Sequence, residues 1–194
     1  MTKYLHAALG IPIDLVYKYF AITCVTAPIF GVIFSMVIFN CIGGYNKSRS
    51  HDAVCIFALL ACVVACPIPY LSDVNTVFVL LWLVFFFGSI MLAPSVGIML
   101  NQVKPSRRTT ANSLATTFYN LLGYLPAPFV FGYFADLKPD QPEYSLRIAI
   151  GVILYWSIIC LVFMIFAYIL ILKRKAERKR LNTSTDRISD AMSF

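Results

Sequence analysis

Residues 101–136 decide how the whole chain is interpreted, and their sequence is NQVKPSRRTTANSLATTFYNLLGYLPAPFVFGYFAD. They begin as a short basic loop and continue as a mainly apolar segment, predicted to span residues 112–134. Small polar side chains lie in the first half of this segment, and glycine and proline interrupt its second half. Polar groups, helix breakers and flanking charge occur together here, so functional residues are expected in this stretch.

The rest of the chain has the composition of a membrane protein. Of its 194 residues, 60% are hydrophobic and only 13% are charged, and the mean hydropathy is +0.79. A soluble domain is about half apolar and about a quarter charged. The charged residues here gather between long uncharged runs, which is typical of an all-α polytopic membrane protein.

The uncharged runs predict five transmembrane helices in one membrane domain, residues 19–172. The predicted spans are residues 19–41, 53–71, 76–100, 112–134 and 148–172. Residues 1–18 carry too much charge to span a bilayer, and residues 173–194 form a basic segment followed by a tail predicted to be disordered. An odd number of spans behind such a beginning favours a chain that continues a larger membrane protein.

The loop charges predict the orientation in the membrane. With five spans, one side carries 12 basic and 4 acidic residues, a net charge of +8, and the other carries 4 basic and 5 acidic residues, a net charge of −1. The positive-inside rule places the first side, with the C-terminus, in the cytoplasm. Basic residues that flank spans do not form a nucleic-acid face, so no nucleic acid is expected as a partner. This pattern does not distinguish the plasma membrane from an endolysosomal membrane.

Polar side chains in the fourth predicted span recur with the period of a helix. Ser113, Thr116, Thr117 and Asn120 are spaced i, i+3, i+4 and i+7, so they form a polar stripe on one face. Such a stripe is costly against lipid and is expected to face protein or a water-filled cavity. Two interpretations stay open: the stripe bonds neighbouring helices, or it lines a substrate path together with Ser95.

Several prolines and glycines are candidate bends or gates. They are Gly123, Pro126, Pro128 and Gly132 in the fourth predicted span, Pro94 in the third and Pro28 in the first. Proline removes a helical hydrogen bond, and glycine permits bending. Breaks at membrane depth are tolerated where they line a cavity or are buried in protein, and transporters use them as gating points. A packing kink without a gating role is the alternative.

Basic residues in two loops are candidates for a cytoplasmic latch or for anchoring to lipid headgroups. They are Arg107 and Arg108 before the fourth predicted span, and Lys47 and Arg49 between the first two spans. The predicted spans contain no Asp, Glu, Lys, Arg or His, so a residue that couples transport to an ion is expected elsewhere. The sequence also shows no nucleophile–base pair and no metal-ligand cluster, so neither an enzyme, a cofactor nor a metal is predicted.

These residues resemble the C-terminal half of a major facilitator superfamily transporter. The five spans are then similar to helices eight to twelve of that fold, and the Gly43-Gly44 turn with Lys47 and Arg49 looks like a degraded copy of the family's glycine and basic loop motif. Two branches fit the fourth span. The spinster-like branch carries a basic residue, Thr-Ala, Leu-Gly, Pro and Gly…Asp, found here as Arg108, Thr110-Ala111, Leu122-Gly123, Pro128 and Gly132…Asp136.

The organic anion transporter polypeptides form the second branch. Their eleventh helix carries Leu-Gly, Pro-x-Pro, Phe-Gly and Asp, and the pair Pro126 and Pro128 favours them. The loop near Asp73 is too short for their cysteine-rich outer domain, whereas Tyr124 replaces an acidic residue often found in the spinster-like branch. The spinster-like resemblance is therefore the first choice and the organic anion branch the second.

The resemblance implies alternating-access transport of an amphipathic organic solute, a lysolipid or an organic anion. The first, third and fourth spans would line or gate a cavity shared with a missing N-terminal half, and the second and fifth would be peripheral. A non-transporting membrane subunit derived from a half-transporter is the alternative, and pairing of two copies is a third possibility. The expected partners are the lipid bilayer, a small organic solute, and the missing half or a second copy.

Overall fold

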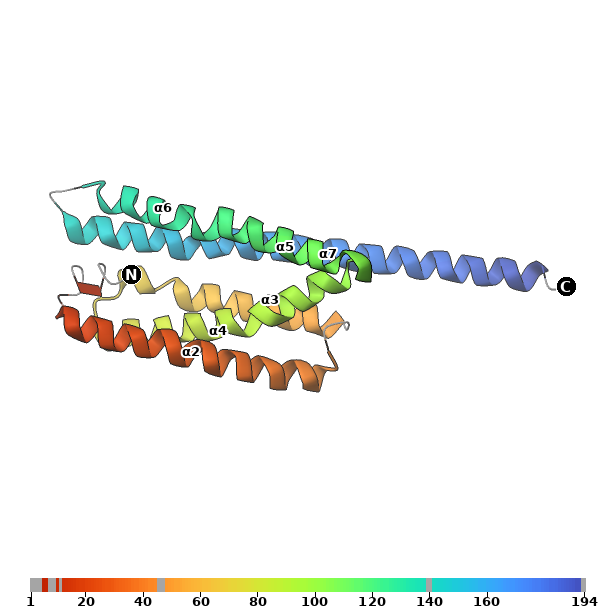
Figure 1. Ribbon diagram of the computed structural model, residues 1–194, viewed down its shortest axis with the longest axis horizontal. Coiled ribbons are helices and arrows are strands. Elements are labelled where there is room, and N and C mark those ends of the chain that lie inside the picture. Colours follow the sequence, from red (N-terminus) through yellow and green to blue (C-terminus); the bar gives the residue numbers. More distant parts are fainter. Residues whose placement is uncertain (1–4, 7–9, 11, 45–47, 139–140, 193–194) are drawn as a thin grey trace. The chain divides into compact units, whose positions relative to one another are not determined.

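The computed structural model describes residues 5–6, 10, 12–44, 48–138 and 141–192, and their regular structure is helical throughout (Figure 1). In chain order the elements are α2 (Ile13–Ile42), α3 (Ser48–Ala65), η1 (Ile68–Tyr70), α4 (Val74–Asn101), η2 (Pro105–Arg107), α5 (Arg108–Tyr119), η3 (Asn120–Tyr124), α6 (Pro126–Ala135) and α7 (Pro142–Met192). The chain forms two compact units, Met1–Ile158 and Ile159–Phe194. The second unit is the later part of α7.

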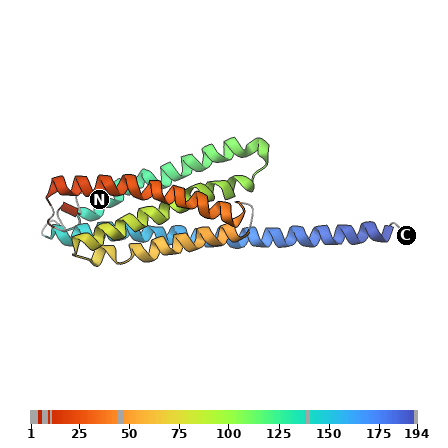
Figure 2. The ribbon, with the colours of Figure 1, turned by 90° about the horizontal axis from the view of Figure 1, so that it is seen from below.

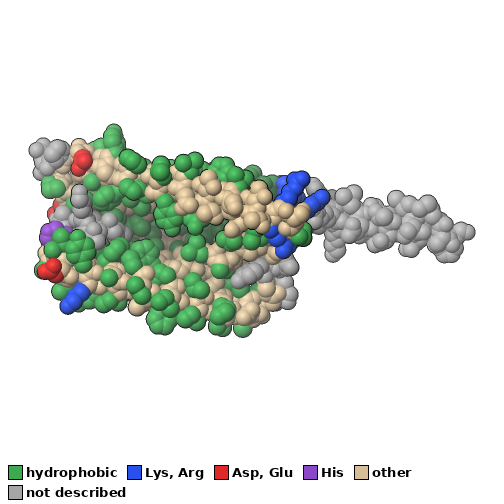
Figure 3. Space-filling model, in the orientation of Figure 1, with side chains coloured by type: hydrophobic (Ala, Val, Ile, Leu, Met, Phe, Trp, Pro, Cys, Tyr) green, Lys and Arg blue, Asp and Glu red, His purple; other side chains and the backbone are tan. Residues whose placement is uncertain are grey.

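Four helical segments among the described residues are long and apolar enough to cross a membrane. They are Ile13–Ile42, Arg49–Tyr70, Val74–Asn101 and Pro142–Arg174. Large apolar side chains cover their outer surfaces, and Ile22, Val25 and Met36 of α2 are all more than half exposed. On the face shown in Figure 3, the described charged side chains gather at the two ends of the apolar surface and none lies between them. The protein is therefore an all-α polytopic membrane protein, as predicted.

The fourth predicted span is divided into shorter segments. Residues 108–135 form α5, the π-helical segment η3 and α6, and none of the three alone is long enough to cross a bilayer. The other predicted spans fall within α2, α4 and α7, and the second covers most of α3 together with η1. The division of the fourth span occurs where its glycine and prolines lie, so the local sequence accounts for it.

Helices α2 and α4 lie side by side through a stripe of small residues (Figures 1 and 2). Thr23, Ala27, Gly31 and Ser35 recur at every fourth position of α2, and all four are buried. A Cβ atom at Gly31 would lie 2.7 Å from the carbonyl oxygen of Phe86 in α4. In a membrane, small residues of this kind let two helix backbones approach closely, and dispersion contacts then stabilise the pair. This small-residue stripe was not recognised in the sequence.

Pro94 lies inside α4, which continues through it without a break. Because proline has no N–H, the carbonyl oxygen of Ile90 receives no α-helical hydrogen bond. The hydroxyl of Ser35 in α2 donates a hydrogen bond of 2.7 Å to that same carbonyl. Ser35 and Pro94 are both buried, so the unpaired carbonyl is satisfied by the neighbouring helix.

This arrangement predicts that the importance of Ser35 depends on Pro94. We expect Ser35→Ala to destabilise the protein by roughly 0.6–1.7 kcal/mol, the range of hydrogen bonds between membrane helices. In a Pro94→Ala background the restored N–H of residue 94 can bond Ile90, so Ser35→Ala should then cost much less. A double-mutant cycle of thermal stability in detergent measures this difference. Equal costs in both backgrounds would contradict the pairing.

Helix α3 and the turn after it contact both α4 and the first part of α7. Helix α3 packs against α4, where the rings of Phe57 and Phe87 stack with centroids 6.3 Å apart. On α7, the hydroxyl of Tyr155 donates to the carbonyl oxygen of Cys66, which follows α3, at 3.2 Å. The second predicted span thus has protein neighbours on two sides, although the family resemblance implies a peripheral position for it.

Helix α7 continues beyond the predicted fifth span. Its backbone stays helical through the basic run after Leu172 and on to Met192, where the sequence predicts a disordered tail. The run KRKAERKRL after Leu172 consists of good helix formers without glycine or proline. The local sequence therefore does not end the helix where the apolar segment ends. At the other end of the chain, α2 begins at Ile13, six residues before the predicted span.

Candidate functional site

The polar stripe lies on the exposed surface of α5 and the first residue of η3. Ser113, Thr116, Thr117 and Asn120 are all exposed. Thr117 bonds its own helix, because its hydroxyl donates to the carbonyl oxygen of Ser113 at 2.9 Å. No hydrogen bond from these four side chains to another described helix is present, so within this chain the stripe does not hold neighbouring helices together. A role as a substrate surface remains a prediction.

Ser95, the fifth predicted pathway residue, lies on α4. Its hydroxyl is exposed and donates to the carbonyl oxygen of Met91 at 2.6 Å. A serine that bonds back to its own helix satisfies its donor without a partner helix. No hydrogen bond joins Ser95 to the described residues of the polar stripe, and its membership of the pathway also stays a prediction.

The chain changes from α-helix to π-helix immediately after the stripe. The N–H of Leu125 donates to the carbonyl oxygen of Asn120, five residues earlier, at 3.0 Å. Pro126 begins α6, and neither Pro126 nor Pro128 has an N–H with which to continue the α-helical ladder. The π-helical segment therefore adjusts the backbone at the proline pair, and such segments are frequent at functional sites.

The other candidate bends lie in unbroken helix. Pro28 and Pro94 lie inside α2 and α4, and Gly132 lies inside α6. Gly123 lies inside the π-helical segment η3, just before Pro126 begins α6. A Cβ atom at Gly123 would meet no other atom within 4 Å, so packing does not demand a glycine there and backbone freedom is its remaining contribution.

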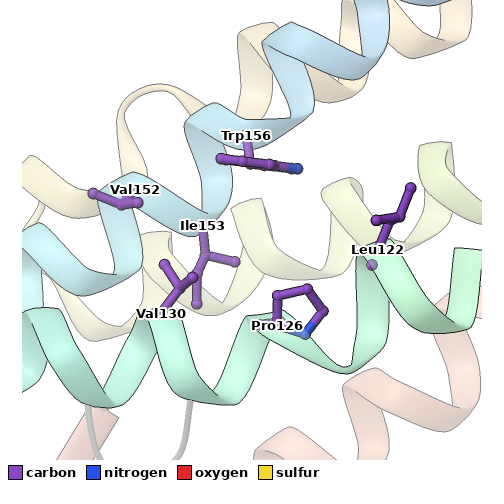
Figure 4. Close-up of a pocket in the computed structure, with 8 residues that line it drawn as sticks. Leu122, Pro126, Val130, Val152, Ile153 and Trp156 are labelled. Carbon is purple, nitrogen blue, oxygen red and sulfur yellow. The ribbon is translucent and has the colours of Figure 1, made fainter.

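A cavity of about 200 Å³ lies between the π-helical segment and α7 (Figure 4). Its lining is almost wholly apolar and includes Leu122, Gly123 and Pro126 from one side and Ile153 and Trp156 from the other. None of the stripe residues lines it. The π-helical segment therefore has free space on the side of α7, whereas the stripe before it is exposed.

The basic residues at the start of α5 are also exposed. Arg107 ends η2 and Arg108 begins α5, and no described acidic side chain forms an ion pair with either. Cations at a helix N-terminus face the positive end of the helix dipole, so these two do not stabilise α5. Arg49 is exposed near the start of α3, and Lys47 lies outside the described residues. The predicted latch is not tested by these contacts.

Comparison with known families points to the same part of the chain. Residues 61–138 match the model of the Organic Anion Transporter Polypeptide (OATP) family. No curated protein and no solved structure matches the chain. The OATP match begins within α3 and ends after α6, so it includes η1, α4 and the whole α5–η3–α6 stretch.

The OATP match supports the second of the two resemblances found in the sequence. The pair Pro126 and Pro128, which favoured that branch, lies within the matched residues. The spinster-like resemblance, ranked first, receives no support. The short loop near Asp73, which had counted against this branch, lies within the matched residues. The OATP proteins are transporters, which agrees with the expectation that this chain is not an enzyme.

One residue at the other end of the helices was missed by sequence analysis. Arg147 of α7 donates through Nη1 to the carbonyl oxygens of Pro69 and Leu71, each at 3.2 Å. Its Nη2 bonds the hydroxyl of Ser72 at 3.0 Å, and both Nη2 and Nε bond Glu143. All these partners outside α7 belong to the turn between α3 and α4, so Arg147 fixes that turn to α7. The positive charge was counted for orientation, and its bonding partners are too distant in sequence to be predicted.

The same turn also caps α4. Asp73 accepts a hydrogen bond from the N–H of Thr76 at 3.0 Å and another from the Thr76 hydroxyl. These two hydrogen bonds lower the pKa of the Asp73 carboxyl below its ordinary value, because they stabilise the carboxylate. The bond from the Thr76 hydroxyl has the larger effect and the bond from the backbone N–H the second. An aspartate at this position satisfies an otherwise unpaired N–H of the helix terminus.

Proposed function

We propose that this chain forms part of an organic anion transporter of the OATP type, working by alternating access. The observation that carries the proposal is the exposed polar stripe directly before the π-helical segment, both within the residues that match the OATP model. Exposed hydroxyl and amide groups on an otherwise apolar surface need a watery path or another protein surface. An interruption of the α-helix beside them suits a helix that opens and closes that path.

The proposal requires a second protein surface opposite the stripe. In an alternating-access transporter the solute site lies between two halves. That surface would be the other half of the transporter or a second copy of this chain. The solute would be an amphipathic organic anion, because the stripe offers hydrogen bonds while the surrounding helices offer apolar contacts; a lysolipid with an anionic headgroup is one such molecule.

The test is uptake of a fluorescent amphipathic sulfonate into membrane vesicles from cells that express the protein. We expect Asn120→Ala and Thr116→Ala each to lower uptake efficiency about ten-fold or more, since a hydrogen bond to a charged solute contributes roughly 1.5–3 kcal/mol. The matched control is Phe118→Ala, an exposed side chain of α5 that is neither three nor four residues from any stripe residue and so lies on another face. Uptake that falls equally in the control, or that stays unchanged in both stripe variants, would contradict the assignment of the stripe as a substrate surface.

Arg107 and Arg108 give a second prediction for transport of anions. The stripe has no charge of its own, so an anion would be attracted by the exposed cations at the start of α5. We expect the double variant Arg107→Gln, Arg108→Gln to raise the KM for the sulfonate about three- to ten-fold at low ionic strength, with little change in kcat.

Salt and an uncharged solute provide the controls for this charge effect. The difference between wild type and the double variant should shrink as salt rises, because mobile ions screen exposed charges. The KM of an uncharged analogue of the same dye should not change. If the KM values of both dyes rise together, the arginines act through structure or orientation instead of through attraction of anions.

A further inference from the structure

A second cavity lies far from the polar stripe in sequence, where η1 meets the first turns of α7. Its volume is about 460 Å³, within the range of small-molecule sites. Three tyrosines line it, Tyr70 from η1 and Tyr144 and Tyr155 from α7, and Pro69 and Gly151 form part of its apolar floor. The transport proposal assigns no role to this cavity.

The charge at this cavity is not available to an anionic ligand. The guanidinium of Arg147 lines the cavity, but its Nη1 donates to two carbonyl oxygens and its Nη2 to Ser72 and Glu143. Nε donates to Glu143 as well, so all five N–H groups are engaged. Glu143 also offsets the positive charge through an ion pair of 3.1 Å. Arg147 therefore serves as a fixed wall, and the ligand must be recognised by other groups.

The remaining walls suit a flat apolar molecule with a hydroxyl group. The Tyr70 side chain is 76% exposed and that of Tyr144 is 50% exposed, so the cavity has accessible aromatic faces and phenol groups. Gly151 has no side chain, and a Cβ atom there would already lie 3.6 Å from Pro69 and 3.7 Å from Tyr155. The floor is thus flat at Gly151. Aromatic rings stack well on a rigid ring system, whereas a flexible acyl chain loses more conformational entropy in such a site.

The position of the cavity agrees with a membrane-boundary ligand. The membrane-crossing segment of α7 begins at Pro142, so Tyr144 and Arg147 lie at its end, where tyrosines gather at membrane surfaces. The backbone of Lys138 is tied to Ser145, and Lys138 Nζ lies 5.1 Å from the centre of the Tyr144 ring. Lys138, Tyr144 and Leu146 also follow, in reverse order, the short sequence pattern associated with cholesterol contact, which is weak evidence on its own.

We propose that this cavity binds a sterol, with the ring system between the tyrosines and the floor at Gly151 and the hydroxyl on a phenol group at the membrane surface. The site lies at the end of a membrane-crossing segment, and it has the flat apolar floor, the aromatic faces and the neutral hydrogen-bonding groups that such a ligand needs. This inference does not depend on the transported solute.

The test uses a photoreactive sterol with the 194-residue protein in phospholipid vesicles. We expect labelling to map to residues 144–155, to be competed by unlabelled sterol, and to fall at least about five-fold in Tyr70→Ala and in Gly151→Leu. Tyr70→Ala changes an exposed side chain, so it tests the site without disturbing a core. The matched control is Tyr133→Ala, an exposed tyrosine of α6 outside the cavity, which should keep full labelling.

Two outcomes would overturn the proposal. Labelling that spreads over the lipid-facing helices and is unchanged by the variants would mean that sterol only surrounds the protein. Labelling at this cavity that is competed by added anionic phospholipid but not by sterol would mean that the site takes a phospholipid headgroup.

Discussion

Gly31→Ala is expected to destabilise the protein by about 1–3 kcal/mol, the cost of overpacking a tight interface. The added Cβ atom would lie 2.7 Å from the carbonyl oxygen of Phe86 and 2.9 Å from Cβ of Ser89. The carbonyl belongs to the backbone of α4, so a side-chain rotation cannot relieve the contact and the two helices must move apart. The measurement is thermal unfolding of the purified protein in detergent.

The matched control for this prediction is Gly88→Ala in α4. A Cβ atom at Gly88 would meet no other atom within 4 Å. Alanine favours a helix over glycine by roughly 0.5–1 kcal/mol, so this variant should be neutral or slightly stabilising. If both variants lower the melting temperature to a similar extent, the close approach of α2 and α4 at Gly31 is wrong.

Arg147→Ala is the second variant with a large expected effect, a loss of about 1.5–3 kcal/mol. It removes the donors that satisfy the carbonyl oxygens of Pro69 and Leu71, and both groups lie in a turn that has no helical partner for them. Arg147→Lys should recover only part of the loss, because an ammonium group cannot reach the same set of acceptors in a fixed plane. Stability in detergent again provides the measurement.

Glu143→Gln separates the ion pair from the other bonds of Arg147. The Glu143 side chain is 60% exposed, so its pairing is well screened by solvent. We expect Glu143→Gln to change stability by about 0.5 kcal/mol or less. If this substitution costs as much as Arg147→Ala, then the ion pair, and not the contact with the turn, is what Arg147 contributes.

Sequence reasoning succeeded where a property repeats along a single segment. The apolar runs identified the membrane helices, and the spacing of Ser113, Thr116, Thr117 and Asn120 placed them on one face. The proline pair at Pro126 and Pro128 lies where the π-helical segment has ended and α6 begins. Each of these signals needs only neighbours within a few residues, and helical geometry converts them directly into structure.

Sequence reasoning was weaker for contacts between distant residues and for the order of the family branches. Pro94 lies inside α4, and the bend predicted there stays a prediction; what the sequence did not reveal is that Ser35 from α2 satisfies the carbonyl that proline leaves unpaired. The choice between branches depended on the length of one loop, and the family match favours the branch that this loop had counted against.

By itself, the sequence determined that this is a helical membrane protein. It also showed that a polar stripe is followed directly by a segment rich in glycine and proline. Only the tertiary structure decided which helix faces meet. Helices that are apolar on all sides present no preferred face to the bilayer, so hydrophobicity cannot select their neighbours. The selection comes from close contacts between distant residues: Gly31 against Phe86, Ser35 on the carbonyl of Ile90, and Arg147 on the turn at Pro69.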